Sequence, residues 1–78
     1  MEDHTRRKRL IFRSTHRGNK EMDLVFSQFI EAHLPALSAA ELDIYEALLE
    51  ENDVDIWDWV TGKPCPEQYL PFIERMRA

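Results

Sequence analysis

The chain has 78 residues, too few for more than one ordinary domain, and 44% of them are hydrophobic. This apolar content is enough for one compact core, so we expect a single ordered domain over residues 1–78. The only cysteine, Cys65, excludes an internal disulfide, and no Cys/His grouping has zinc-site spacing. No apolar run approaches the roughly 18 residues of a membrane span, and the first residues do not read as a secretory signal. These features favour a bacterial cytoplasmic protein without membrane insertion.

The net charge of −5 is distributed very unevenly along the chain. Residues 1–20 carry seven cations and two acids, whereas residues 21–78 carry three cations and thirteen acids. The molecule should therefore be an electric dipole, which would orient its encounters with a partner.

Hydrophobic spacing predicts five short helices and no strand, so we expect an all-α fold, a small five-helix bundle. The first helix is expected over residues 3–16, with the segment 10–12 (LIF) as its apolar contribution. The second is expected from Glu21 to Leu34, where Pro35 stops it. Its apolar stripe consists of Met22, Val25, Phe26, Phe29, Ile30 and His33.

The third helix is expected to begin after Ser38, which forms a capping box with Glu41. Its inward positions are Leu42, Tyr45, Leu48 and Leu49. Asp53 should cap a short fourth helix that Gly62 ends. A fifth helix is expected over residues 66–77, burying Tyr69, Leu70, Phe72, Ile73 and Met76, with a bend at Pro71.

Four arginines of the first predicted helix recur at steps of three and four, which places them on one face. They are Arg6, Arg9, Arg13 and Arg17. Such a stripe is either a solvated face or a surface that docks to an acidic or phosphate-bearing protein. Nucleic-acid binding is disfavoured, because the rest of the chain is strongly acidic and no aromatic platform is interleaved with the arginines.

The join between the first two helices, HRGNKEMD (residues 16–23), allows two interpretations. Gly18 is either a helix-ending residue beside an exposed Arg17–Glu21 pair, or a backbone segment that lies flush against another surface. In the second case, the cation and the anion flanking the glycine would pair across that contact. The spacing alone does not decide between them.

Trp57 and Trp59 are two residues apart, so on a helix they point to nearly opposite sides. We expect one in the core and the other exposed as a binding anchor, and the sequence leaves open which is which. Residues suited to catalysis are scattered: the three histidines lie far apart, and Cys65 has no evident base beside it. The sequence thus predicts no catalytic residue and no metal site. It predicts instead a protein that acts through another macromolecule.

The segment from His16 to Pro66 resembles the succinate dehydrogenase assembly factor two family, the SdhE-type flavinators. The family pattern R-G-x-x-E, an apolar residue and Asp corresponds to Arg17, Gly18, Glu21, Met22 and Asp23. The resemblance continues through the capped third helix, the D-x-D step, the W-x-W ending and GKPCP. It does not extend distinctively into the C-terminus.

This resemblance implies an assembly factor that promotes covalent attachment of FAD to a histidine of the succinate dehydrogenase flavoprotein, or of fumarate reductase. FAD would belong to that partner, and the factor would be a non-catalytic monomer. By position, Arg17, Gly18 and Glu21 would press against the flavoprotein, supported by Met22 and Asp23. We add Arg13 and Trp59 as partner-binding candidates. The alternative is a generic interaction module, such as an antitoxin-like regulator.

Overall fold

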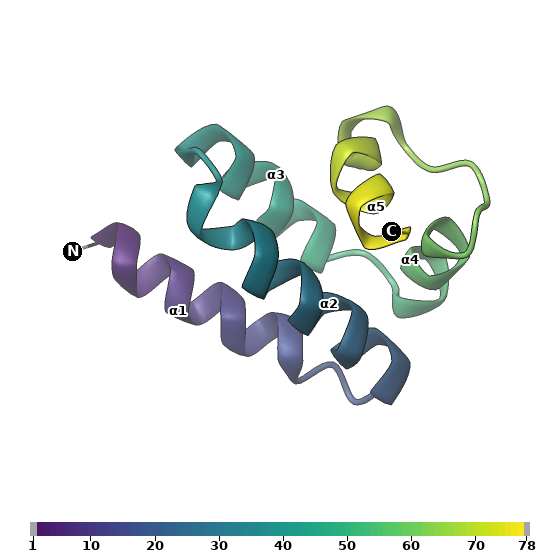
Figure 1. The fold of residues 1–78 in the computed structure, drawn as a ribbon, viewed down its shortest axis with the longest axis horizontal. Coiled ribbons are helices and arrows are strands. Elements are labelled where there is room, and N and C mark those ends of the chain that lie inside the picture. Colours follow the sequence, from purple (N-terminus) through teal and green to yellow (C-terminus); the bar gives the residue numbers. More distant parts are fainter. Residues whose placement is uncertain (1, 78) are drawn as a thin grey trace. The chain divides into compact units, whose positions relative to one another are not determined.

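The computed structural model describes residues 2–77, and these residues form helices, turns and no strand. There are five α-helices, as predicted, so the all-α class is confirmed for the described part of the chain (Figure 1). By its internal contacts the chain divides into two units, one ending at Ala36 and the other beginning at Leu37. Each unit is described by itself.

The first unit is a helical hairpin. Helix α1 spans Glu2–Thr15, helix α2 spans Lys20–His33, and the two pack against each other in antiparallel directions (Figure 1). A 3₁₀ turn, Leu34–Ala36, follows α2. The α-helix ends just before Pro35, as predicted, and the proline is accommodated in the tighter turn. The Arg7 guanidinium fixes this end by donating to the Leu34 carbonyl.

The buried side chains of the hairpin follow the predicted stripe of α2 but only part of the expected apolar side of α1. The buried set is Leu10, Met22, Phe26, Phe29, Ile30 and Leu34. Ile11 and Phe12 are exposed, contrary to the prediction. Successive helix positions are about 100° apart, so three adjacent apolar residues cannot all face one core. Leu10 and Ser14, one turn apart, take the inward positions, and the Ser14 hydroxyl donates to the Leu10 carbonyl at 2.6 Å.

The second unit begins with α3, Ala39–Leu49, and its capping box forms as predicted. Glu41 N–H donates to Ser38 Oγ at 3.1 Å, and Ser38 N–H donates to Glu41 Oε1 at 2.8 Å. The four inward residues predicted for this helix are all buried. Helix α4 follows, Asp53–Val60, with Asn52 rather than Asp53 at the N-cap position. Asp53 instead lies in the first turn, where its negative charge interacts favourably with the positive end of the helix dipole.

The last segment differs from the single helix predicted over residues 66–77. A 3₁₀ turn, Glu67–Tyr69, precedes helix α5, Leu70–Arg77. Pro71 is the second residue of α5, where its missing N–H costs nothing, and an α-helix extended further back would clash with the proline ring. Pro71 therefore sets the start of the helix and does not bend its middle.

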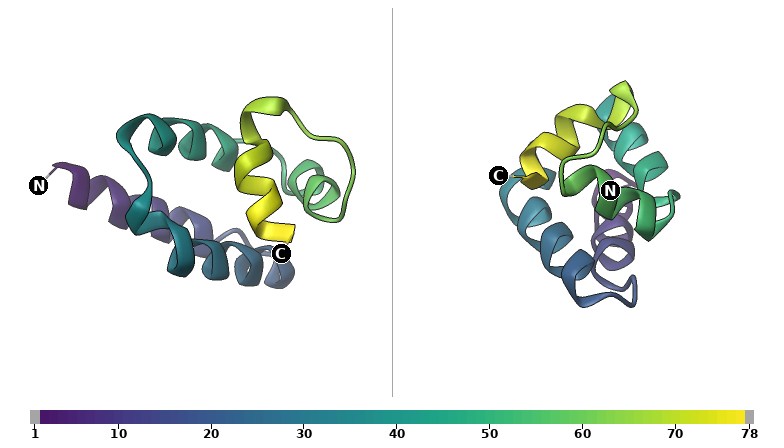
Figure 2. Two further views of the ribbon diagram at one scale, coloured as in Figure 1. Left: turned by 45° about the horizontal axis from the view of Figure 1, so that its top comes forward. Right: turned by 90° about the vertical axis from the view of Figure 1, so that its right-hand side faces the viewer.

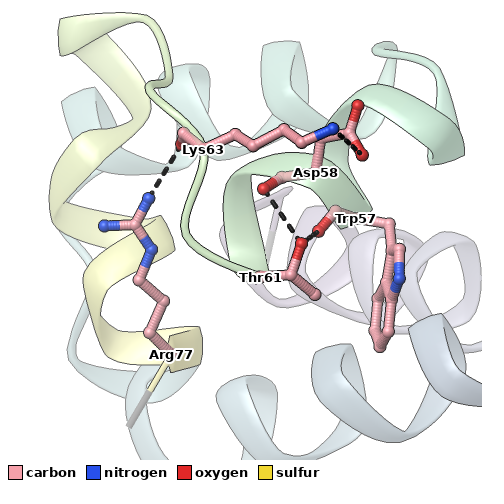
Figure 3. A network of polar contacts seen from close by, with 5 residues as sticks. All are labelled: Trp57, Asp58, Thr61, Lys63 and Arg77. Carbon is pink, nitrogen blue, oxygen red and sulfur yellow. Dashed lines mark hydrogen bonds and ion pairs between the residues drawn. The ribbon is translucent and has the colours of Figure 1, made fainter.

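Helices α4 and α5 pack against each other, and α5 returns toward the end of α4 after a connector of residues 61–66 (Figure 2). Arg77, in the last turn of α5, holds this arrangement. Its Nε donates to the Trp59 carbonyl at 2.9 Å. Its Nη2 donates to the Lys63 carbonyl at 3.0 Å (Figure 3). The C-terminal helix is thus tied to the end of α4 by one charge-assisted hydrogen bond and to the connector by another.

Candidate functional site

The turn that joins α1 to α2 adopts a conformation that favours glycine. Gly18 has a φ of +83°, in the left-handed region, and no heavy atom lies within 4 Å of where a Cβ would be. The glycine is therefore required by backbone conformation and not by crowding within the chain. The space in front of it is open, so another surface could approach the backbone closely.

Asn19 caps the start of α2 beside this glycine. Its Oδ1 accepts the N–H of Glu21 at 3.0 Å and that of Met22 at 3.2 Å, which satisfies two amides that lack helical partners. This cap was not predicted, although Asn is among the strongest capping residues. The bonds fix the direction in which the chain leaves the turn.

Asp23 and Met22 hold the turn from the inner side. Asp23 Oδ1 accepts the Arg17 N–H at 3.1 Å, so the turn is closed on the first turn of α2. Met22 is fully buried at the start of the apolar stripe. Both residues thus have the geometry of supports for the turn. That the turn itself binds a partner stays a prediction.

The two charges that flank Gly18 are not equivalent in the structure. The Arg17 guanidinium carbon lies 5.3 Å from the centre of the Phe26 ring, a cation–π contact inside the hairpin, and Arg17 is half-buried. Glu21 is exposed on the first turn of α2. The interpretation in which both charges pair across a contact requires both to point outward, and only Glu21 is exposed. Arg17 would have to leave its aromatic contact to reach across an interface.

The basic stripe of α1 is shorter than predicted, because Arg17 lies beyond the last residue of the helix. Arg9 is exposed, whereas Arg6 and Arg13 are half-buried. Arg13 lies in the last turn of α1, where a cation interacts favourably with the helix dipole. The arginines therefore do not form one uniformly solvated face.

Neither tryptophan of α4 is fully buried, contrary to the expectation that one would lie in the core. Trp57 is 38% exposed, while Trp59 is half-buried with its ring centre 5.8 Å from that of Tyr69. Tyr69 in turn donates its hydroxyl to Glu51 at 2.9 Å. Trp57 consequently presents more surface to a partner than Trp59, the residue chosen from the sequence.

The described residues contain no cluster of three or more His, Cys, Asp or Glu side chains placed to hold a metal ion. Within residues 2–77, no helix is both long and apolar enough to cross a membrane. Cys65 is a free, half-buried thiol in the proline-rich connector.

Two further features of the structure were not predicted from the sequence. Phe12 is 62% exposed on α1 and stacks on His16, and Arg77 bonds to carbonyls 14 and 18 residues earlier in the chain. The four-residue spacing of Phe12 and His16 was a local signal that could have predicted their contact. No local pattern could have predicted the bonds of Arg77.

Comparison with known proteins gives a consistent result. A family model described as "Flavinator of succinate dehydrogenase" matches residues 8–78. The chain is 41% identical to "FAD assembly factor SdhE" of Acetobacter pasteurianus, over 91% of this chain and 67% of that protein. It is 39% identical to "Succinate dehydrogenase assembly factor 2, mitochondrial" of Yarrowia lipolytica, over 97% of this chain and 57% of the relative.

A protein of the same printed name from Candida glabrata is 46% identical over 82% of this chain and 44% of its own length. The chain thus spans 44% to 67% of the length of these curated relatives. No solved structure matches it. The family match, which covers nearly the whole chain and includes the Gly18 turn, leads to one conclusion: this chain belongs to the family of flavinators of succinate dehydrogenase.

Proposed function

We propose that the chain binds the flavoprotein subunit of succinate dehydrogenase and promotes covalent attachment of FAD to a histidine of that subunit. The bond would form on the flavoprotein, and this chain would hold the immature subunit in a conformation that reacts with its own FAD. FAD would thus be the partner's cofactor, and the chain a non-catalytic monomer. Fumarate reductase, where present, is proposed as a second client.

The observation that carries this proposal is the Gly18 turn within a chain of this family. The turn is held from inside by Asp23 and Asn19, while the space in front of its glycine is open. A turn fixed in advance loses little conformational freedom when it docks. The exposed Glu21 beside it can accept charge-assisted hydrogen bonds from the flavoprotein.

Arg17 has a conditional role in this proposal. In the free chain the Arg17 guanidinium lies over Phe26, and the backbone N–H of Arg17 donates to the Asp23 carboxylate. At the interface the side chain would exchange the cation–π contact, worth about 0.5–2 kcal/mol, for a carboxylate or carbonyl of the flavoprotein. If it remained over Phe26, it would act by keeping the turn in shape.

The test is co-expression of the chain with its own organism's flavoprotein in cells that lack a flavinator, followed by flavin fluorescence on a denaturing gel. Wild type should give covalently flavinylated flavoprotein. Gly18→Arg should abolish the signal, because the arginine would fill the open space in front of the turn.

Gly62→Arg is the matched control, because Gly62 also has a positive φ, +117°, and open space at its Cβ position. Both variants place an arginine at a position with positive φ, so their backbone strain is of the same kind. Circular dichroism should therefore report similar helix content for the two variants. Gly62→Arg should retain flavinylation. Full covalent flavin with folded Gly18→Arg would overturn the role of the turn. No gain of flavin with wild type would overturn the proposed function.

A further inference from the structure

The outward side of α1 near its C-terminal end carries an aromatic and basic surface that the Gly18 turn does not include. We call it the α1 outer face and define it by Lys8, Arg9, Phe12 and His16, all of them exposed. At 62%, Phe12 is the most exposed Phe, Tyr or Trp side chain among the described residues. A large apolar ring in this position has no role in the core of the hairpin.

The Phe12 ring is held in place at the surface by His16. The two rings stack with centres 3.9 Å apart and an angle of 14° between their planes. His16 Nδ1 lies 2.9 Å from the Phe12 carbonyl and 3.1 Å from Thr15 Oγ1. Thr15 Oγ1 in turn donates to the Ile11 carbonyl at 2.9 Å.

These partners assign the proton of the His16 ring. A carbonyl can only accept a hydrogen bond, and the Thr15 hydroxyl already donates its hydrogen to Ile11. Nδ1 is therefore assigned as the protonated nitrogen, which donates to the Phe12 carbonyl. The stacking and the hydrogen bonds of His16 together favour this arrangement of the two rings at the surface. An aromatic anchor that is already ordered loses little entropy when it binds.

The charges around this stacked pair indicate the chemistry of its partner. Lys8 and Arg9 are exposed four and three residues before Phe12, so both lie one helical turn from it on the same side of α1. Lys20 adds a third exposed cation after the turn. An apolar centre with a cationic rim is complementary to an apolar pocket with an acidic rim.

We propose that the α1 outer face is a second contact with the flavoprotein, in which Phe12 enters an apolar pocket and Lys8 and Arg9 pair with carboxylates at its rim. This inference rests on the proposed function and extends the interface from Gly18 back along α1. A protein is favoured over nucleic acid, because residues 21–78 carry thirteen acids and three cations, which would repel a phosphate backbone. The face also offers one aromatic platform and not a series for successive bases.

The experiment measures the dissociation constant of the chain for the FAD-free flavoprotein subunit of its own organism. Phe12→Ala should weaken binding about 10- to 30-fold, as expected for a central aromatic anchor. Val54→Ala is the control, since Val54 is 70% exposed on α4 and its loss should change affinity less than about twofold. Neither change removes a buried side chain, and thermal melting verifies that both variants remain folded.

Charge reversal tests the rim separately. Lys8→Glu should weaken binding, mainly through slower association, and the difference from wild type should shrink as salt is added. Lys63→Glu changes the net charge by the same amount in the second unit, where the Lys63 side chain is 69% exposed, and should have a smaller effect. His16→Ala should weaken binding less than Phe12→Ala, because it removes only the support of the ring.

The outcomes separate this inference from the proposed function. Suppose that wild type binds and flavinylates the flavoprotein, that Gly18→Arg does neither, and that Phe12→Ala binds like wild type. The proposed contact through the α1 outer face is then wrong, while the proposed function stands. If wild type does not bind the flavoprotein, both are wrong. If a DNA duplex binds and only that binding depends on Lys8 and Phe12, the face belongs to a nucleic-acid site and the inference fails.

Discussion

The turns at Gly18 and Gly62 both follow a helix and both use a glycine at positive φ, but they are stabilised in different ways. The Gly62 turn has local bonds, such as the Lys63 N–H to the Asp58 carbonyl at 2.9 Å, and Arg77 adds distant bonds by donating to the carbonyls of Trp59 and Lys63. The Gly18 turn is held by residues that directly follow it, Asn19 and Asp23. A glycine at positive φ is therefore not by itself a sign of a binding site.

The difference has a functional consequence. The Gly62 turn connects α4 to α5, and its polar groups are used within the second unit. The Gly18 turn is held by Asn19 and Asp23, which lie close to it in the chain, and it continues into the exposed Phe12 and His16 pair on one side and Glu21 on the other. Local stabilisation leaves the outer side of such a turn available to a partner.

The largest expected effect on stability comes from removing the distant bonds. Arg77→Ala should lower the free energy of unfolding by about 1–2 kcal/mol, because two charge-assisted hydrogen bonds to backbone carbonyls are lost. For a chain of this size that corresponds to a melting temperature about 5–15 °C lower. Arg75→Ala, on the same exposed end of α5, should stay within about 0.5 kcal/mol of wild type. Equal melting temperatures for the two variants would contradict the role given to Arg77.

A smaller effect should distinguish the two asparagine caps. Asn19→Ala should cost about 1 kcal/mol, since the Asn19 side chain accepts two hydrogen bonds at the start of α2. Asn52→Ala should cost less, because Asn52 occupies the N-cap position of α4 without a side-chain capping bond. Urea denaturation of both variants measures the difference. A larger loss of unfolding free energy with Asn52→Ala than with Asn19→Ala would contradict the stabilising role given to the Asn19 cap.

The smallest expected effect concerns the acid sensitivity of the caps. The Ser38 N–H donates to the Glu41 carboxylate and lowers the pKa of Glu41 below its ordinary 4.5, with the Ser38 hydroxyl and the charge of Arg75 acting in the same direction. The stabilisation is therefore present above the unfolded-state pKa and is lost as the pH falls through the lower, folded-state pKa. The capping bonds of Asn19 involve no titrating group.

Nuclear magnetic resonance titration should accordingly place the midpoint of Glu41 below 4.5, and Glu41→Gln should make stability less dependent on pH in that range. Glutamine is the suitable replacement because it keeps an oxygen that accepts the Ser38 N–H. A midpoint at or above 4.5 would show that the capping box does not favour the ionised carboxylate.

Much of the architecture could be predicted because it depends on neighbours along the chain. The limits of α1 and α2 were predicted to within a residue, and the capping box of Ser38 and Glu41 was predicted in full. Helix periodicity also identified most of the buried residues of α2 and α3. These features are determined by backbone hydrogen bonds and side-chain spacing within one or two turns.

The sequence by itself thus determined the helices, their apolar stripes and the position of the Gly18 turn, since each follows from contacts between residues a few positions apart. Only the tertiary structure decided that Arg17 lies over Phe26, that Phe12 is exposed, and that Trp57 is more exposed than Trp59. It also decided the pairing of Arg77 with the end of α4. The reason is physical: exposure and long-range hydrogen bonds depend on how helices pack, and residue spacing does not encode that packing.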